Sequence, residues 1–146
     1  ESYEIRGAAF EIYKSLRNGH KEKVYQNALY ISLKKRGLAV DRERRIKIYY
    51  TGEDIGTYTP DFIINKDILI ELKAKPRLVQ DDIKQFWQYL KGSRYILGFL
   101  INFGSNDGVE IIRRVFDTAR SKQYLPRSSA SGRLGPSVVE GRPASA

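Results

Sequence analysis

The feature that most limits how this chain can fold is the segment Ile68–Ala74, which reads Ile-Leu-Ile-Glu-Leu-Lys-Ala. Its aliphatic and β-branched residues are typical of a strand in the middle of a sheet. Glu71 and Lys73 interrupt the apolar run, and ionisable side chains are seldom found in such a strand without a partner or a metal ion. The segment therefore predicts a central strand whose polar side chains have a specific task.

A second carboxylate is expected opposite this strand. The dipeptide Pro60-Asp61 precedes it, and a hairpin that turns about Lys66 would place Asp61 opposite Glu71. Directly opposed residues have Cβ atoms about 4.5–5.5 Å apart, a distance at which like charges repel. Because alternate residues of a strand share a face, Lys73 joins Glu71 on that face. We expect a cation between the two carboxylates.

This set of groups suits the hydrolysis of a phosphodiester. A hard divalent cation held by two carboxylates can activate water and polarise a phosphate, while an ammonium group helps to balance the charge. The chain has no Cys and one His, so Mg²⁺ or Mn²⁺ held by oxygen ligands is expected. The spacing is equally compatible with a surface ion pair between Glu71 and Lys73 and a turn role for Asp61. The apolar neighbours of Glu71 favour the metal site.

The pattern of apolar residues predicts an α/β fold with the element order ααβββαββ. Helices are expected at residues 3–17, His20–Arg36 and Leu78–Leu90, and strands at Val40–Thr51, Ile55–Ile64, Ile68–Ala74, Tyr95–Phe103 and Val109–Phe116. The first three strands are expected to form an antiparallel meander. Residues 1–125 are predicted to be one domain and 126–146, rich in Ser, Gly, Pro and Ala, a disordered tail.

The charge of the chain favours a polyanionic partner, since the net charge is +9. Nucleic acid, with DNA preferred, is the expected partner, and the sequence leaves a homodimer open. The residues expected to form a phosphate-binding rim are Arg42, Arg44, Arg45, Lys47, Lys75, Arg77 and Lys84. No apolar run approaches the ~20 residues that span a bilayer, so no membrane partner and a cytoplasmic location are expected.

Several short motifs occur in a fixed order over about Tyr3–Val115. They are Gly19-His20-Lys21-Glu22-Lys23-Val24-Tyr25, Pro60-Asp61-Phe62-Ile63, Ile70-Glu71-Leu72-Lys73-Ala74 and Leu100-Ile101-Asn102-Phe103-Gly104. Through them the chain resembles the GxxExxY proteins, a branch of the PD-(D/E)xK nuclease superfamily that is similar to the RecB-like and lambda-exonuclease-like enzymes. The resemblance implies a restriction-endonuclease-like core with a mixed central sheet flanked by helices, and metal-dependent cleavage of nucleic acid.

The resemblance also implies roles for individual residues. Glu22 would bind or orient the metal and its water, and Asp61 and Glu71 would ligate the metal, joined by the backbone carbonyl of Leu72. Lys73 would position or activate the water. A carboxylate in the first turn of a helix is also favoured by the helix dipole, so Glu22 taken alone is equally explained by a role in stabilising the helix.

On the expected third helix, Gln85 and Tyr89 lie four residues apart and therefore share a face. They resemble the QxxxY motif of RecB-like nucleases, which implies that they border the active site. Tyr89 could equally be a core aromatic. Tyr25 is expected to pack near Glu22, and His20 to be solvated or to contact a phosphate.

Two other functions remain open from the sequence. One is a catalytically silent nucleic-acid-binding module with the same fold. The other is a protein-interaction domain with an aromatic surface made of Tyr25, Tyr30, Tyr49, Tyr50 and Tyr58.

Overall fold

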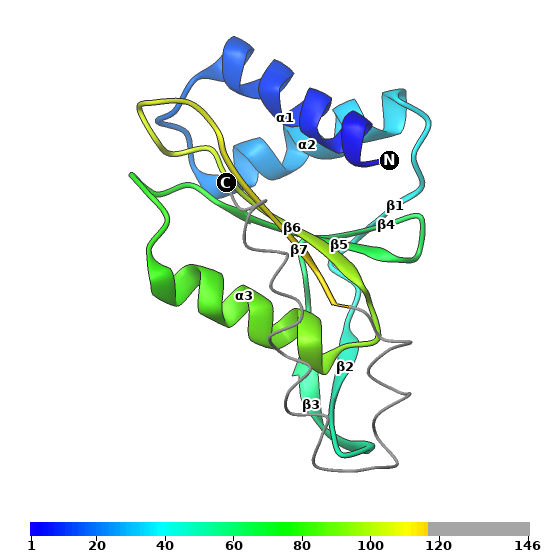
Figure 1. Ribbon diagram of the computed structural model, residues 1–146. Helices are drawn as coiled ribbons and strands as arrows, with labels where there is room; N and C mark the ends of the chain where they lie inside the picture. Colours follow the sequence, from blue (N-terminus) through cyan, green and yellow to red (C-terminus); the bar gives the residue numbers. More distant parts are fainter. Residues whose placement is uncertain (117–146) are drawn as a thin grey trace.

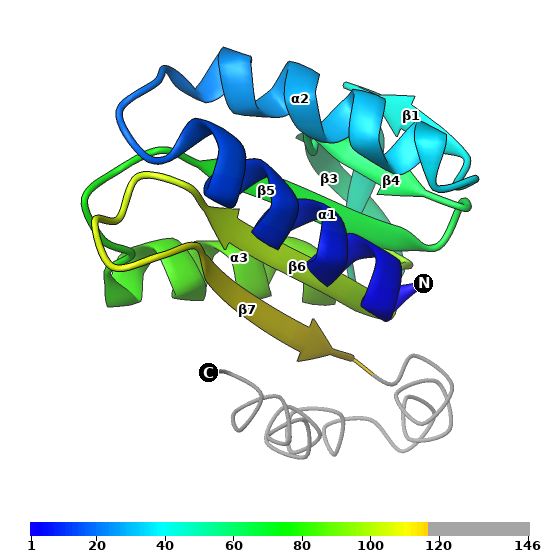
Figure 2. The ribbon, with the colours of Figure 1, turned by 90° about the horizontal axis from the view of Figure 1, so that it is seen from above.

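Helices cover both faces of a central sheet in the computed structural model, which describes residues 1–116 (Figure 1). Helices α1 (Ser2–Leu16) and α2 (Glu22–Lys35) lie on one face, and α3 (Gln80–Gly92) lies on the other. Each helix begins and ends within two residues of its predicted bounds. Figure 2 shows α1 and α2 side by side above the sheet. Their apolar residues recur every three or four positions, as on α1 at Ile5, Ala8 and Ile12.

The main sheet has five strands in the order β1-β4-β5-β6-β7. Their bounds are Val40–Arg42 for β1, Phe62–Ile64 for β4, Ile68–Lys73 for β5, Leu97–Asn102 for β6 and Glu110–Val115 for β7. Neighbouring strands are antiparallel except β5 and β6, which are parallel and joined through α3. The sheet is therefore mixed and flanked by helices, as expected, and β5 is its middle strand.

The predicted three-stranded meander is wrong. Strands β2 (Ile46–Tyr50) and β3 (Glu53–Tyr58) form a separate two-stranded sheet that projects from the main one (Figure 1). The expected strand Val40–Thr51 breaks near Glu43, whose φ of 51° does not fit an extended chain. The expected strand Ile55–Ile64 breaks at Pro60, which has no N–H to donate to a ladder.

The hairpin of β4 and β5 has the predicted register. Phe62 pairs with Ile70 and Ile64 with Ile68. Asn65 and Lys66 form the turn with φ values of 50° and 68°, and the N–H of Asp67 donates to the carbonyl of Ile64 at 3.0 Å. Asp61 directly precedes β4, so this register brings it next to the second half of β5.

Apolar side chains pack on both faces of the hairpin. Ile64 and Ile70 belong to the larger core beneath α1 and α2. Ile63 and Leu69 point the other way, into a smaller core with Leu90 of α3 and with Tyr58 of β3. The smaller core therefore brings the projecting hairpin against the main sheet near the second half of β5.

The predicted tail at 126–146 lies outside the described residues, and the domain boundary at residue 125 stays a prediction. Within residues 1–116, the helices are too short or too polar to cross a membrane.

Candidate active site

Four ionisable side chains that the sequence singled out meet at one end of the main sheet. Glu22 begins α2, Asp61 directly precedes β4, and Glu71 and Lys73 occupy the second half of β5. The N-terminal end of α2 lies over the end of the sheet where β6 finishes (Figure 2). Each of the three carboxylates interacts electrostatically with Lys73. The structure thus brings together residues that are up to 51 positions apart in the chain, as 73 − 22 = 51.

Asp61 is fixed to β5 by a main-chain contact. Its Oδ2 accepts a hydrogen bond of 2.7 Å from the N–H of Leu72, the residue between Glu71 and Lys73. Burial raises the pKa of the Asp61 carboxyl, while the hydrogen bonds from Leu72 and Gln26 and the charge of Lys73 oppose that rise. The Asp61 carboxyl therefore lies against the strand that carries the other two polar groups.

Glu71 has the most perturbed carboxylate of the site. Burial, followed by the negative charge of Asp61, raises the pKa of Glu71 to about 7. The hydrogen bond from Tyr58 and the positive charge of Lys73 act in the opposite direction. Perturbed carboxylates of this kind are concentrated at functional sites, although structural ion pairs can produce them too.

Glu22 is the most exposed of the three carboxylates. Partial burial, then the charge of Asp61, raises the pKa of Glu22, and Lys73 opposes this. Glu22 lies in the first turn of α2, where the helix dipole favours a negative charge. The repulsion from Asp61 and the attraction to Lys73 show that Glu22 also faces these two residues of the site.

Gln26 is a residue of this site that the sequence did not single out. Only 5% of it is exposed, and its Nε2 donates a hydrogen bond of 2.9 Å to Oδ1 of Asp61. The available signal was its spacing, because Gln26 lies four residues after Glu22 and therefore on the same face of the helix.

Tyr58 is the second residue that sequence reasoning missed in this role. Its hydroxyl donates a hydrogen bond of 2.7 Å to Oε1 of Glu71. The ring is 9% exposed, so it is not part of an open aromatic surface. No local sequence pattern predicts the contact between Tyr58 and Glu71, because it depends on the break at Pro60 that separates β3 from the main sheet.

The two residues of the QxxxY motif have different surroundings. The ring of Tyr89 stacks on that of Tyr58, with centroids 3.9 Å apart and planes 6° apart. Tyr89 therefore borders the site through Tyr58. Gln85 is exposed, and its side chain forms no hydrogen bond with any residue in the range 1–116. The structure does not bring Gln85 to the carboxylates.

Tyr25 holds the loop that leads into Glu22. It is fully buried, stacks on Phe103 at 4.8 Å, donates a hydrogen bond to the carbonyl of Arg17, and accepts one of 3.2 Å from the N–H of His20. Tyr25 thus packs near Glu22, as expected. The side chain of His20 is exposed.

Asn102 explains the motif at the end of the fourth predicted strand. Its fully buried side chain bonds both the N–H and the carbonyl of Lys75, each at 2.9 Å. A Cβ at Gly104 would lie 2.4 Å from the Lys75 main chain, so only glycine allows this close approach. Both residues fix the chain directly after Lys73.

The basic residues expected to form one rim are divided among three places. Lys75 forms an ion pair of 2.8 Å with Asp82, and Arg77 and Lys84 are exposed near the end of β5 and on α3. Arg42 lies between Asn27, at 2.6 Å, and the ring of Tyr30, at 4.6 Å. The remaining three, Arg44, Arg45 and Lys47, line a pocket beside β2.

The donor set fits a hard divalent cation, since carboxylate oxygens are its preferred ligands and Asp61 repels both Glu22 and Glu71. In this structure Gln26 and Tyr58 bond one oxygen each of Asp61 and Glu71. Across residues 1–116, no group of three or more His, Cys, Asp or Glu side chains is arranged to hold a metal ion. A bound cation therefore requires these carboxylates to reorient.

Comparison with known proteins agrees with the geometry. A family model described as the PD-(D/E)XK nuclease superfamily matches residues 1–115. No curated protein and no solved structure matches the chain. The narrower resemblance to GxxExxY proteins stays a prediction. The matched residues include all three acids, Lys73 and every element of the described fold, and the chain belongs to the PD-(D/E)XK nuclease superfamily.

Proposed function

We propose that the protein is a divalent-metal-dependent nuclease that hydrolyses phosphodiester bonds of nucleic acid, with DNA as the preferred substrate. The observation that carries the proposal is the set of three carboxylates around Lys73, in which the charge of Asp61 raises the pKa of both Glu22 and Glu71. Membership of a nuclease superfamily supports it.

Asp61 and Glu71 would hold Mg²⁺ or Mn²⁺ directly, with Glu22 and the backbone carbonyl of Leu72 as further oxygen ligands. A cation bound there supplies charge to polarise the phosphate and to acidify a water molecule. Gln26 and Tyr58 each donate a hydrogen bond to one oxygen of these carboxylates, which leaves further lone pairs for a cation. These two residues would then orient the carboxylates from behind.

Lys73 would act on the substrate side of the site. Its positive charge lowers the pKa of each of the three acids. The same charge would balance the negative charge that develops on the phosphate oxygens during hydrolysis. Lys73 would also hold the attacking water by a hydrogen bond. Tyr89 would support the site through its stack on Tyr58, and Gln85 would act only on bound substrate.

The expected substrate is supported by the charge of the protein. The net charge of +9 attracts a polyanion. Lys75 and the exposed Arg77 follow the end of β5, and the exposed Lys84 lies on α3. These three residues are the part of the predicted phosphate-binding rim that is closest in the chain to Lys73.

Cleavage of labelled DNA and RNA with Mg²⁺, with Mn²⁺ and with a chelator tests the proposal. We expect cleavage only with the cation, and a loss of at least about a hundredfold in Glu71→Gln and in Lys73→Ala. Cleavage that persists unchanged in both variants would assign the activity to a contaminant and contradict the proposal.

The catalytically silent nucleic-acid-binding module is the second candidate. It is favoured by the hydrogen bonds that Gln26 and Tyr58 donate to Asp61 and Glu71. It is also favoured because, among residues 1–116, no three potential ligands are already arranged to hold a metal ion. It predicts binding that depends steeply on salt, does not depend on divalent cations and is not followed by cleavage.

A further inference from the structure

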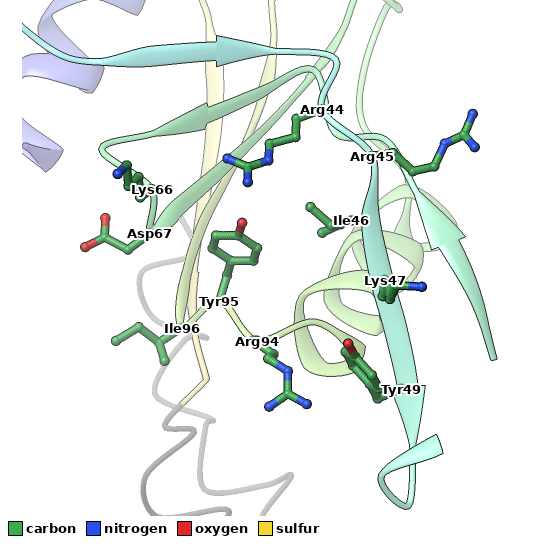
Figure 3. Close-up of a pocket in the computed structure, with 10 residues that line it drawn as sticks. All are labelled: Arg44, Arg45, Ile46, Lys47, Tyr49, Lys66, Asp67, Arg94, Tyr95 and Ile96. Carbon is green, nitrogen blue, oxygen red and sulfur yellow. The ribbon is translucent and has the colours of Figure 1, made fainter. Parts of the chain in front are cut away.

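A basic pocket lies at the other end of the main sheet from the carboxylates. Its volume is about 570 Å³, and it opens between the start of β2, the β4–β5 turn and the segment that precedes β6 (Figure 3). Its lining residues are Arg44, Arg45, Ile46, Lys47, Tyr49, Lys66, Asp67, Arg94, Tyr95 and Ile96. Five of these side chains are basic and one is acidic.

The pocket keeps much of its positive charge. Arg44 pairs with Asp41 at 3.2 Å and Lys47 with Asp54 at 2.8 Å. Arg45, Lys66 and Arg94 form no ion pair within residues 1–116. A concave surface with several cations and little compensating charge attracts phosphate groups.

Two aromatic rings accompany these cations. In Figure 3, Tyr95 and the guanidinium group of Arg44 point into the middle of the pocket, whereas Arg45 and Lys47 point away from it, to the other side of β2. The guanidinium group of Arg94 lies over the ring of Tyr49, 4.4 Å from its centroid. Basic grooves that carry aromatic rings are typical of surfaces that bind single-stranded nucleic acid, because every base can stack.

The backbone of the β4–β5 turn supports a binding role for Lys66. Lys66 has a φ of 68° and is exposed, at a turn position where glycine is the favoured residue. A lysine there costs stability, and an observed strained residue motivates a hypothesis of function. The lysine places an unpaired ammonium group at the rim of the pocket.

The pocket is separate from the candidate active site. Asp67 lines it and Lys73 belongs to the carboxylate end, and these residues are six positions apart along an extended strand. At about 3.3 Å per residue, the two sites are about 20 Å apart.

We propose that this pocket binds an unpaired stretch of the nucleic-acid substrate about 20 Å away from the bond that is cut. Arg44, Lys66 and Arg94 hold phosphates, and Tyr95 stacks on a base. The inference rests on the proposed function for the identity of the substrate. It adds a second contact that selects strands with an unpaired segment.

Binding without cleavage tests this inference. The probe is a labelled oligothymidylate of about 12 nucleotides, titrated in chelator against the Glu71→Gln protein and followed by fluorescence anisotropy. Arg44→Gln/Arg94→Gln in this background is compared with Lys14→Gln/Lys35→Gln, which removes the same charge from exposed positions on α1 and α2. We expect the pocket variant to bind about tenfold more weakly, and its salt slope to fall by about 1.4 because two phosphate contacts are lost.

Two single variants separate binding from folding. Lys66→Gly relieves the strained turn, so its thermal midpoint should stay the same or rise while its affinity falls. Tyr95→Leu keeps an apolar side chain in the smaller core, and we expect an affinity loss of about tenfold with an unchanged salt slope.

Three results would overturn the inference: equal losses in the pocket variant and its control, displacement of the oligonucleotide by polyglutamate at equal charge, or equal binding of a duplex of the same length. If the wild-type chain does not cleave with Mg²⁺ but the pocket variants bind more weakly, the proposed function fails and the pocket assignment stands. If cleavage occurs and the pocket variants bind like the control, the proposed function stands and the pocket assignment fails.

Discussion

The hydroxyl group of Tyr58 donates a hydrogen bond of 2.7 Å to Oε1 of Glu71. Gln26 makes the corresponding contact with Oδ1 of Asp61 at 2.9 Å. Neither donor belongs to the Pro60-Asp61 or Glu71-Leu72-Lys73 motif, yet both stabilise the ionised form of the acid that they contact. The candidate site therefore depends on two residues that lie outside its motifs.

Replacing Tyr58 by Phe should raise the pKa of Glu71 further above 7, because the hydrogen bond that lowers it is lost. The pH at which Mn²⁺ binding reaches half its maximum should move upward, which calorimetric titrations over a pH series can measure. Tyr89→Phe is the matched control, since it keeps the stacked pair and leaves the bond to Glu71 intact. The same midpoint in both variants would show that Tyr58 has no such role.

Replacing Gln26 by Leu should weaken cation binding and activity by about 10–100-fold, because Asp61 loses the partner that orients it. Leu fills most of the volume of the buried amide, so we expect the free energy of unfolding to fall by only about 1–2 kcal/mol. Gln88→Leu, at an exposed position of α3, provides the control. Activity and cation affinity that are unchanged in Gln26→Leu would count against this account.

The pKa of Glu71 predicts how the metal-free protein responds to pH. The folded state raises this pKa from 4.5 to about 7, so it holds the proton more tightly than the unfolded chain does. The resulting stabilisation is present below about pH 4.5 and is lost as the pH rises through about 7, by up to about 3 kcal/mol. Asp61 and Glu22, whose pKa values are also raised, act in the same direction.

Urea unfolding in chelator at about pH 5 and about pH 8 measures this effect. The decline in the free energy of unfolding should be distinctly smaller in Glu71→Gln, whose side chain stays neutral, than in Glu53→Gln, a change at the exposed turn of the projecting hairpin. An equal decline in the two variants would refute the assignment of the raised pKa to Glu71.

The two QxxxY residues should differ in their effects. Tyr89→Leu removes the stack on Tyr58 and should lower the free energy of unfolding by about 1 kcal/mol, together with activity. Gln85→Ala should change stability by no more than about 0.5 kcal/mol and leave cation affinity intact, so that any effect is on KM for nucleic acid. A loss of cation affinity in Gln85→Ala would contradict the observed separation.

The elements that the sequence predicted well are those with local signals. Helical periodicity predicts α1 to α3, and the turn about Lys66 predicts the register of β4 and β5. The mixed sheet followed from the resemblance. The break before β2 was not predictable from residue type, since Glu43 is not a residue expected at positive φ, whereas Pro60 was a visible signal for the break after β3.

The candidate site was predicted in part for the same reason. Asp61, Glu71 and Lys73 share a strand pair and a short spacing, and Glu22 came from a motif. Tyr58 and Gln26 reach their partners across 13 and 35 positions of the chain, through contacts that only the packed structure creates. Helical spacing from Glu22 could have indicated Gln26, but nothing local indicated Tyr58.

The central claim is that Asp61 and Glu71 bind a divalent cation together, and calorimetry tests it most directly. Mn²⁺ is titrated at about pH 6.5 in two buffers with different heats of ionisation, which gives the number of protons released. Because the pKa of Glu71 is about 7, the wild-type chain should release up to one proton per cation, and Glu71→Gln should bind far more weakly and release fewer. No binding heat in the wild-type chain, or unchanged affinity in both Asp61→Asn and Glu71→Gln, would contradict the claim.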